Sequence, residues 1–318
     1  MAVYAFIFPG QGSQTVGMGQ EIANAFPVAR AIFEEIDDSL NTHLSKIIFN
    51  GPIKELTITE NTQPALMAVS IAVLRALEHE GNLDISKIVT VLAGHSLGEY
   101  TALTAGKALI LPEAARLLRL RGQAMQHAVP LGEGGMLALV GANLDQAEAL
   151  CTSCGGDGNL EIANDNGGGQ IVLSGKMACL EKAISIAKEM QIKRTIMLPV
   201  SAPFHSSLME SAKDVMAKAL AQAHLDSPVV PLISNVTATC ENDIDVIRQN
   251  LVRQVVSRVR WRESIDEMVR MGVDTFVEVG SGKVLSNIVK RIVPTASTFH
   301  IGTPVDIEYF LQSLGKVM

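Results

Sequence analysis

The sequence has only four cysteines in 318 residues, and they do not form the pattern of a metal or disulfide site. Cys151 and Cys154 lie close together, but Cys179 and Cys240 stand alone, so a second pair of zinc ligands is missing. We expect four reduced thiols without a structural role and no metal. Reduced thiols are typical of a reducing, cytoplasmic compartment.

Long apolar runs and an excess of positive charge are also missing. The first apolar run stops at Phe8 without a basic leader, and no window approaches the ~20 apolar residues of a membrane span. The 26 Lys+Arg residues are outnumbered by 33 Asp+Glu, which gives a net charge of -7. The chain therefore lacks the basic field of sequence-independent nucleic-acid binding, and we expect neither a membrane nor a nucleic-acid partner.

The residues that are present predict a large core, since 47% of the chain is apolar and only 19% is charged. Short β-branched runs alternate with segments of helical period, a pattern typical of a mainly parallel sheet covered by helices. Strands are expected at 3–8, 88–93, 230–234, 275–279 and 298–301. A long helix is expected at 63–80, capped by Asn61 or Thr62 and stopped at Gly81.

The pattern changes between about residues 132 and 199. It predicts a strand at 135–140, a helix at 144–154 capped by Asn143, strands at 160–165 and 170–174, a helix at 176–190 and a strand at 194–198. This β-α-β-β-α-β order is that of a ferredoxin-like unit, and the glycines at 167–169 fit a tight hairpin between its middle strands. We therefore predict an α/β fold in which a large α/β-hydrolase-like domain (1–130 and 200–318) carries an inserted small ferredoxin-like domain (131–199), with a cleft between them.

The strongest local motif is GHSLG at residues 94–98, which matches G-x-S-x-G between a predicted strand and a predicted helix. Its glycines allow a sharp turn that exposes the Ser96 hydroxyl, and the amides after the serine can stabilise an oxyanion. The alternative is an ordinary glycine-rich turn, which the strand-turn-helix context disfavours. Ser96 is therefore the candidate nucleophile.

A serine nucleophile needs a base, and two of the seven histidines are candidates. His205 follows a proline-stiffened stretch after a strand and precedes a helix, whose N-terminal dipole would keep the imidazole neutral. His300, paired with an acid such as Asp274, would instead fit an esterase of the α/β-hydrolase type. The remaining histidines carry no catalytic motif of their own: His43, His79, His95, His127 and His224.

Two further patterns are less specific. The glycine-rich segment after the first strand has Thr15 where a dinucleotide fingerprint needs glycine, and Val277 and Val284 replace required residues of a phosphate loop near 280–283. A helix expected at 111–126 carries three arginines, and a guanidinium in a cleft can bind a carboxylate by two parallel hydrogen bonds. Spacing does not choose among them, and a solvated helix face is the alternative for each: Arg116, Arg119 and Arg121.

Taken together, the motifs follow one order along essentially the whole chain. They are GQGSQ at 10–14, GHSLGEY at 94–100, RGQAM at 121–125, AN at 163–164 before the Gln170 strand, FHS at 204–206 and LVRQ at 251–254. In this order the chain resembles the malonyl-CoA:acyl carrier protein transacylases of type II fatty acid synthesis. It is also similar to the acyltransferase domains of polyketide and animal-type fatty acid synthases.

The resemblance implies catalytic roles for five residues. Ser96 would be the nucleophile and His205 the general base and acid. A backbone carbonyl near Gln254, in place of an aspartate, would orient the imidazole. The backbone amides of Gln11 and Leu97 would form the oxyanion hole.

The resemblance also implies a substrate site. Arg121 would pair with the malonyl carboxylate, while Met125, Asn164 and Phe204 would bind the substrate. The Phe204-His205 pair goes with malonyl in polyketide acyltransferases, although residues 202–205 depart from the usual pattern of that subfamily. No cofactor is implied, because malonyl-CoA is the substrate and the phosphopantetheine belongs to the acyl carrier protein. We expect a cytoplasmic monomer.

Carrier proteins of this type are acidic, so an acidic enzyme needs a local basic rim to bind one. Charge density alone offers two clusters: Lys283, Lys290 and Arg291, or Arg258, Arg260 and Arg262. A solvated face is the alternative for either. Three alternative functions stay open at this point: a trans-acting polyketide acyltransferase, a serine esterase and a catalytically silent carrier-binding protein.

Overall fold

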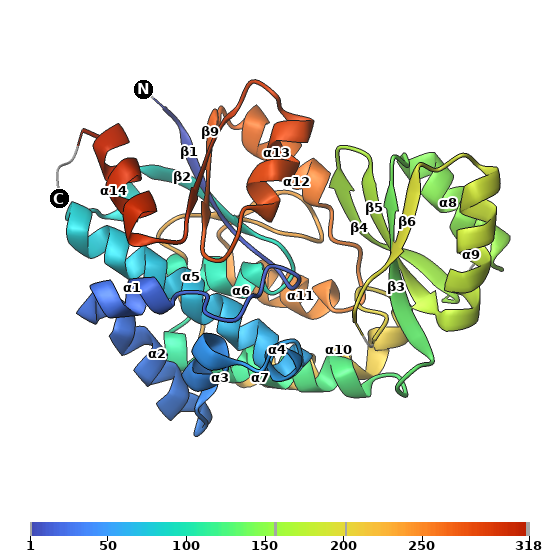
Figure 1. The fold of residues 1–318 in the computed structure, drawn as a ribbon, viewed down its shortest axis with the longest axis horizontal. Helices are drawn as coiled ribbons and strands as arrows, with labels where there is room; N and C mark the ends of the chain where they lie inside the picture. The colour runs from blue at the N-terminus through green and yellow to red at the C-terminus, as the bar shows by residue number, and fades with distance from the viewer. Residues whose placement is uncertain (1, 156–157, 201, 316–318) are drawn as a thin grey trace.

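The computed structural model describes residues 2–155, 158–200 and 202–315, which form two β-sheets with helices around them (Figure 1). Sheet A has the strand order β10-β9-β1-β2-β7-β8, and sheet B the order β4-β5-β3-β6. The strands are β1 (Tyr4–Phe8), β2 (Val89–Gly94), β3 (Gly134–Val140), β4 (Leu160–Gly167), β5 (Gln170–Lys176), β6 (Arg194–Met197), β7 (Leu232–Ile233), β8 (Cys240–Glu241), β9 (Thr275–Val279) and β10 (Ser297–Ile301).

The helices cover both faces of sheet A and one face of sheet B (Figure 1). They are α1 (Gln20–Ala25), α2 (Pro27–Leu40), α3 (Leu44–Asn50), α4 (Ile53–Leu56), α5 (Thr59–Gly81), α6 (Gly98–Ala105), α7 (Leu111–His127), α8 (Leu144–Ser153), α9 (Met177–Glu189), α10 (Glu210–Gln222), α11 (Ile244–Gln254), α12 (Trp261–Arg270), α13 (Val284–Ile292) and α14 (Pro304–Ser313). Two short 3-10 helices, η1 (Ile85–Lys87) and η2 (Ser207–Met209), complete the set.

Sheet A is parallel except for β8, and apolar layers cover both of its faces. Successive side chains of a strand point to opposite faces. Phe6 and Phe8 accordingly join the core around α5, while Ala5 and Ile7 join a second core with Trp261 of α12. A parallel sheet buried on both sides is the α/β arrangement expected from the sequence, and that prediction is confirmed.

The carboxyl end of sheet A brings two turns together. β1 and β2 are parallel neighbours, so the loop after Phe8 and the turn after Gly94 leave the sheet at the same edge. The backbone amide of His95 donates to the carbonyl oxygen of Phe8 at 3.0 Å, which ties the two turns to each other. Ligand sites of open α/β sheets form outside this edge.

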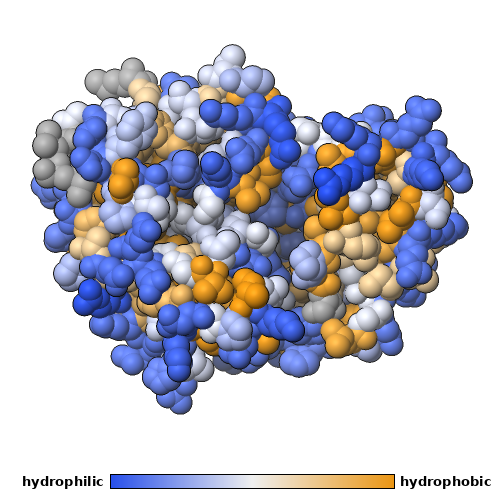
Figure 2. Space-filling view, viewed as in Figure 1, coloured by the Kyte–Doolittle hydropathy of each residue, from blue (hydrophilic) through white to orange (hydrophobic). Residues whose placement is uncertain are grey.

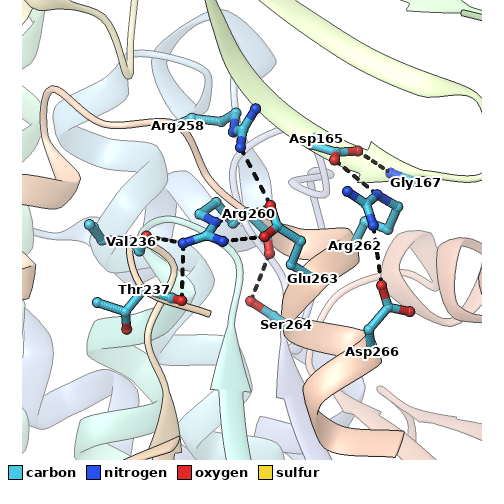
Figure 3. Close-up of polar contacts among 10 residues, drawn as sticks. All are labelled: Asp165, Gly167, Val236, Thr237, Arg258, Arg260, Arg262, Glu263, Ser264 and Asp266. Atoms are coloured by element: carbon cyan, nitrogen blue, oxygen red, sulfur yellow. Dashed lines mark hydrogen bonds and ion pairs between the residues drawn. The ribbon is translucent and has the colours of Figure 1, made fainter. Parts of the chain in front are cut away.

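Sheet B is antiparallel and has the predicted β-α-β-β-α-β order, with its own apolar core beneath α8 and α9. The Asn143 capping box and the glycine hairpin between β4 and β5 are also present. β4 is attached to the rest of the chain, because Asp165 N donates to Val259 O at 3.0 Å and Val259 N to Ala163 O at 2.8 Å. Arg262 adds an ion pair to Asp165 at 3.0 Å (Figure 3). The domain boundaries at 131 and 199 stay a prediction.

Three sequence expectations differ in detail from the structure. Helix α5 begins at Thr59, before Asn61 and Thr62, so neither of these residues is its cap. Their side chains donate instead to the carbonyl oxygens of Glu55 and Leu56. The helix includes Gly81 and ends at a left-handed residue, Asn82. The strand expected at 230–234 narrows to the two residues of β7.

The sequence predicts neither disulfide bonds nor a membrane span, and the described residues bear on both. All four cysteines are free. In the part of the chain that the structure describes, no helix combines the length and the apolar character that a bilayer crossing requires.

Candidate active site

A cavity of 170 Å³ opens at the carboxyl edge of sheet A, on the side that faces sheet B. Figure 2 shows the surface hollowed between the two parts of the molecule. Eight of the nine site residues named from the sequence line the cavity: Gln11, Ser96, Leu97, Arg121, Met125, Asn164, Phe204 and His205. The ninth, Gln254, is completely buried and contacts three of them.

The turn that carries Ser96 depends on two glycines. Ser96 has a φ of 54°, in the left-handed region that serine rarely adopts. A Cβ on Gly94 would lie 1.9 Å from backbone atoms of Gly98, and one on Gly98 would lie 2.4 Å from the carbonyl oxygen of Phe8. Only glycine fits at either position, so the sequence G-x-S-x-G is what allows the serine to project above the sheet.

Ser96 and His205 form a hydrogen-bonded pair. Ser96 Oγ lies 2.7 Å from Nε2 of His205, and Nδ1 of the same ring lies 2.9 Å from the backbone carbonyl oxygen of Gln254. A carbonyl oxygen only accepts, so Nδ1 carries the ring proton and Nε2 is free to take the serine proton. The pair therefore has the geometry of a nucleophile with its general base.

The imidazole of His205 is neutral at pH 7. Burial is the main cause and the nearby Arg121 charge the next one, and together they lower the pKa of His205 to about 3. The sequence predicts that the dipole of the following helix keeps the imidazole neutral. That helix, α10, begins only at Glu210, after η2, and desolvation takes the leading part instead.

Two residues that line the cavity, Gln11 and Leu97, have backbone amides without a partner among the described residues. Within the described residues, neither the Gln11 nor the Leu97 N–H donates a hydrogen bond. Leu97 directly precedes α6, where the helix dipole also favours negative charge. Free amides at this place can stabilise an oxyanion that forms next to Ser96.

Arg121 is the arginine of α7 that reaches the cavity. Arg116 is exposed, and Arg119 is half-buried and donates to Asn61 at 2.9 Å. Arg121 is only 1% exposed, and its Nη2 lies 3.1 Å from Ser96 Oγ. Among the described residues no carboxylate pairs directly with it. A buried guanidinium without an anion beside a nucleophile is prepared to receive an anionic ligand group.

Three side chains that support the site have no role assigned from the sequence: Gln63, Glu99 and Asn235. Gln63 and Gln254 each accept from Arg121 at 2.8 Å. Asn235 holds the nucleophile turn, accepting from Ser96 N and donating to Gly94 O, both at 2.7 Å. Glu99 belongs to the GHSLGEY segment, so the motif around Ser96 indicates that it lies near the nucleophile. No local pattern marks Gln63 or Asn235. His95 also lines the cavity, and its Nε2 lies 2.9 Å from Oδ1 of Asn166.

The esterase alternative has no corresponding site. Asp274 directly precedes β9. His300 lies opposite Glu278 in the register of β10 and β9, near the other end of these strands. His300 is exposed and faces Asp306 at 3.9 Å, and Asp274 accepts from Val3 N. Neither residue lines the cavity that contains Ser96.

A serine bonded to a neutral imidazole, in one cavity with two residues whose amides are free, is the arrangement of enzymes that pass an acyl group through a serine ester. The chain belongs to the acyl transferase domain family, whose model matches residues 5–301. No group of three or more His, Cys, Asp or Glu side chains in the described ranges has the geometry to hold a metal ion.

Individual relatives are similar over nearly the full length. The chain is 43% identical to malonyl CoA-acyl carrier protein transacylase of Bacillus subtilis, over 99% of this chain and 98% of the relative. The crystal structure of acyl-carrier-protein-S-malonyltransferase from Bartonella henselae has a TM-score of 0.96 at 50% identity, covering 98% and 99% of the two chains. A malonyl-transacylase in complex with a type II PKS acyl-carrier protein has a TM-score of 0.94 at 36% identity, covering 98% and 100%.

Proposed function

We propose that this chain transfers a malonyl group from malonyl-CoA to the phosphopantetheine thiol of acyl carrier protein, by a ping-pong reaction through malonyl-Ser96. The transfer would supply malonyl units for fatty acid chain elongation. One observation carries the proposal: Ser96 Oγ lies between Nε2 of His205 and Nη2 of Arg121, at 2.7 and 3.1 Å, in one cavity. The nucleophile, its base and a cation for a carboxylate thus converge on one atom.

In the first half-reaction His205 takes the Ser96 proton as Oγ attacks the thioester carbonyl carbon. The Gln11 and Leu97 amides donate to the oxyanion of the tetrahedral intermediate. The carbon–sulfur bond then breaks, and the proton passes from His205 to the sulfur of coenzyme A. The thiol of the carrier reverses these steps with its own sulfur and regenerates Ser96.

Arg121 supplies the preference for a dicarboxylic acyl group. Its guanidinium would pair with the free carboxylate of the malonyl unit while the other end reacts at Ser96. An acetyl group would leave this buried cation without its partner, so it should be a poor substrate. Met125, Asn164 and Phe204 line the same cavity and would contact the acyl chain or its thioester arm.

The test is the intact mass of the protein after exposure to malonyl-CoA. The wild type should gain one malonyl group and lose it when a phosphopantetheinylated carrier protein is added, whereas Ser96→Ala should gain nothing. Ser174→Ala is the control for the loss of a serine hydroxyl, since Ser174 is completely buried in β5, away from the cavity, and its hydroxyl has no partner among the described residues. A wild type that stays unlabelled contradicts the proposal.

For the carrier, we propose docking at Lys283, which directly precedes α13, and at Lys290 and Arg291 in the last turn of that helix. All three are exposed, and none forms an ion pair in the part of the chain that the structure describes. The rival cluster is neutralised: Arg258 and Arg260 pair with Glu263, and Arg262 with Asp165 and Asp266 (Figure 3). Lys290→Glu with Arg291→Glu should raise KM for the carrier and leave labelling by malonyl-CoA unchanged, whereas Arg258→Glu should not.

A polyketide carrier is the second candidate acceptor. The similarity to a malonyl-transacylase bound to a type II PKS acyl-carrier protein favours it. Both carrier types present the same thiol, so the comparison is between kcat/KM values for a fatty acid carrier and a polyketide carrier. A higher value for the polyketide carrier would assign the chain to that pathway.

We also propose that the enzyme acts as a cytoplasmic monomer without a bound cofactor. Light scattering in solution tests the oligomeric state.

A further inference from the structure

The carboxylate of Glu99 has no part in the proposed chemistry, although it lies directly behind the cavity. Glu99 is the second residue of α6 and is only 1% exposed. Burying a carboxylate is costly unless its hydrogen bonds compensate, and burial raises the pKa of Glu99 to about 7. The position therefore needs a physical explanation.

The partners of Glu99 supply one. Its Oε2 accepts from Nε2 of Gln254 at 2.7 Å and from the backbone N of Asn235 at 3.2 Å. Gln254 Nε2 also donates to the backbone oxygen of Ser96 at 3.1 Å, and Gln254 Oε1 accepts from Arg121 Nη2 at 2.8 Å. Glu99, Gln254 and Arg121 thus form one hydrogen-bonded chain that ends at the nucleophile.

The direction of the Gln254 amide follows from the two groups at its ends. Turned by a half rotation, it would direct its NH2 at the guanidinium donors and its oxygen at the Glu99 carboxylate, so both contacts would be lost. Glu99 therefore fixes which end of the amide faces Arg121. The guanidinium is then held between two carbonyl oxygens, from Gln254 on Nη2 and from Gln63 on Nη1.

We propose that Glu99 is a positioning residue for the carboxylate subsite: through the Gln254 amide it holds Arg121 where the free acid end of the acyl group pairs, and so sets the preference for acid-terminated acyl groups. This inference rests on the proposed function. It assigns Glu99 no contact with the substrate.

Two substitutions separate the effect of the length of the Glu99 side chain from the effect of its charge. Glu99→Gln keeps the length of the side chain and an acceptor oxygen but removes the charge. Glu99→Asp keeps the charge but is one methylene too short to reach Gln254. We expect the ratio of kcat/KM for malonyl-CoA to that for acetyl-CoA to stay within about threefold of wild type in Glu99→Gln and to fall about tenfold in Glu99→Asp, mainly through KM for malonyl-CoA.

Glu278 provides the matched control. It is the other completely buried glutamate in this sheet region, and it accepts from the backbone amides of Leu285 and Ser286 at 3.0 and 2.7 Å, outside the cavity. Glu278→Gln and Glu278→Asp should leave the malonyl-to-acetyl ratio unchanged, whatever they do to stability. If Glu99→Asp does not fold, Gln254→Asn shortens the same contact from its other side, and the same loss of ratio is expected.

Several results would overturn the inference. The ratio in Glu99→Asp or Gln254→Asn could equal that of wild type, or both substrates could lose activity equally, which would mean a purely structural role. A lower ratio in Glu99→Gln than in Glu99→Asp would mean that charge, not reach, matters. A wild type that acquires no malonyl group overturns the proposed function and this inference together, whereas a labelled wild type with unchanged Glu99 variants overturns this inference alone.

Discussion

The imidazole of His205 is oriented by the backbone carbonyl of Gln254, at 2.9 Å from Nδ1, in the place that a carboxylate takes in a serine triad. A backbone atom stays when the side chain is changed. The side chain of Gln254 has a separate task, since its Oε1 accepts from Arg121. One residue thus supports the base through its backbone and the guanidinium through its side chain.

This division of labour predicts the behaviour of Gln254→Ala. Ser96 should keep its reactivity toward a neutral serine reagent such as phenylmethylsulfonyl fluoride within about threefold, because the Ser96–His205 pair is intact. The kcat/KM for malonyl-CoA should fall about tenfold or more, because Arg121 loses an acceptor. His205→Ala is the comparison, and it should reduce both rates by about 10²–10⁴. Equal losses in Gln254→Ala would contradict the separation.

The guanidinium of Arg121 makes a second prediction. Arg121→Ala should lower kcat/KM for malonyl-CoA by about 100-fold or more and leave acetyl-CoA use nearly unchanged. Arg121→Lys should not rescue malonyl transfer, since an ammonium cannot hold Gln63, Gln254 and a substrate carboxylate with a planar fork. Arg116→Ala, exposed on the same helix, controls for the loss of a positive charge. Competition kinetics with both thioesters measures the ratio directly, and a ratio unchanged in Arg121→Ala would remove this residue from the specificity site.

The lowered pKa of His205 predicts the acid side of the pH profile. The ordinary pKa of histidine is about 6.5, and in the folded protein it is lowered to about 3, mainly by burial. The ring therefore stays neutral and able to accept a proton well below pH 6. We expect the rate of Ser96 acylation in single-turnover experiments to show no protonation step near pH 6.5. Burial lowers the pKa of the neighbouring His95 as well, so a protonation step near pH 6.5 would contradict the buried, neutral state of the base.

Much of this arrangement could be predicted because it is local. The motif around Ser96 determines its own turn. The periodicity of apolar residues predicts the strands and helices of both sheets, and in β1 the neighbours Phe6 and Ile7 point to two different buried faces. The roles of Gln63 and Asn235 could not be predicted, because these residues lie in ordinary helix and loop sequence. They contact Arg121 and Ser96 only after folding. Likewise, the sequence could not rank the two basic clusters. Asp165, the acidic partner of Arg262, is far from it in the sequence and becomes visible only in three dimensions (Figure 3).

The nucleophile turn makes the last prediction, and it concerns stability as well as activity. A methyl group on Gly94 would meet the carbonyl of Gly98 at 1.9 Å, and backbone atoms cannot move aside as a flexible side chain can. We expect Gly94→Ala to cost about 3 kcal/mol of unfolding free energy and to abolish labelling of Ser96, because the turn must open to fit the methyl group.

Gly135→Ala is the control for the general effect of an added methyl group. Its Cβ would meet only side-chain ends, the nearest being Leu180 Cδ1 at 3.3 Å, so it should cost less than about 1 kcal/mol. Thermal unfolding and intact mass after malonyl-CoA exposure measure the two effects. If Gly94→Ala unfolds and reacts like Gly135→Ala, the close packing of Gly94 on Gly98 is not what holds Ser96 in its left-handed conformation.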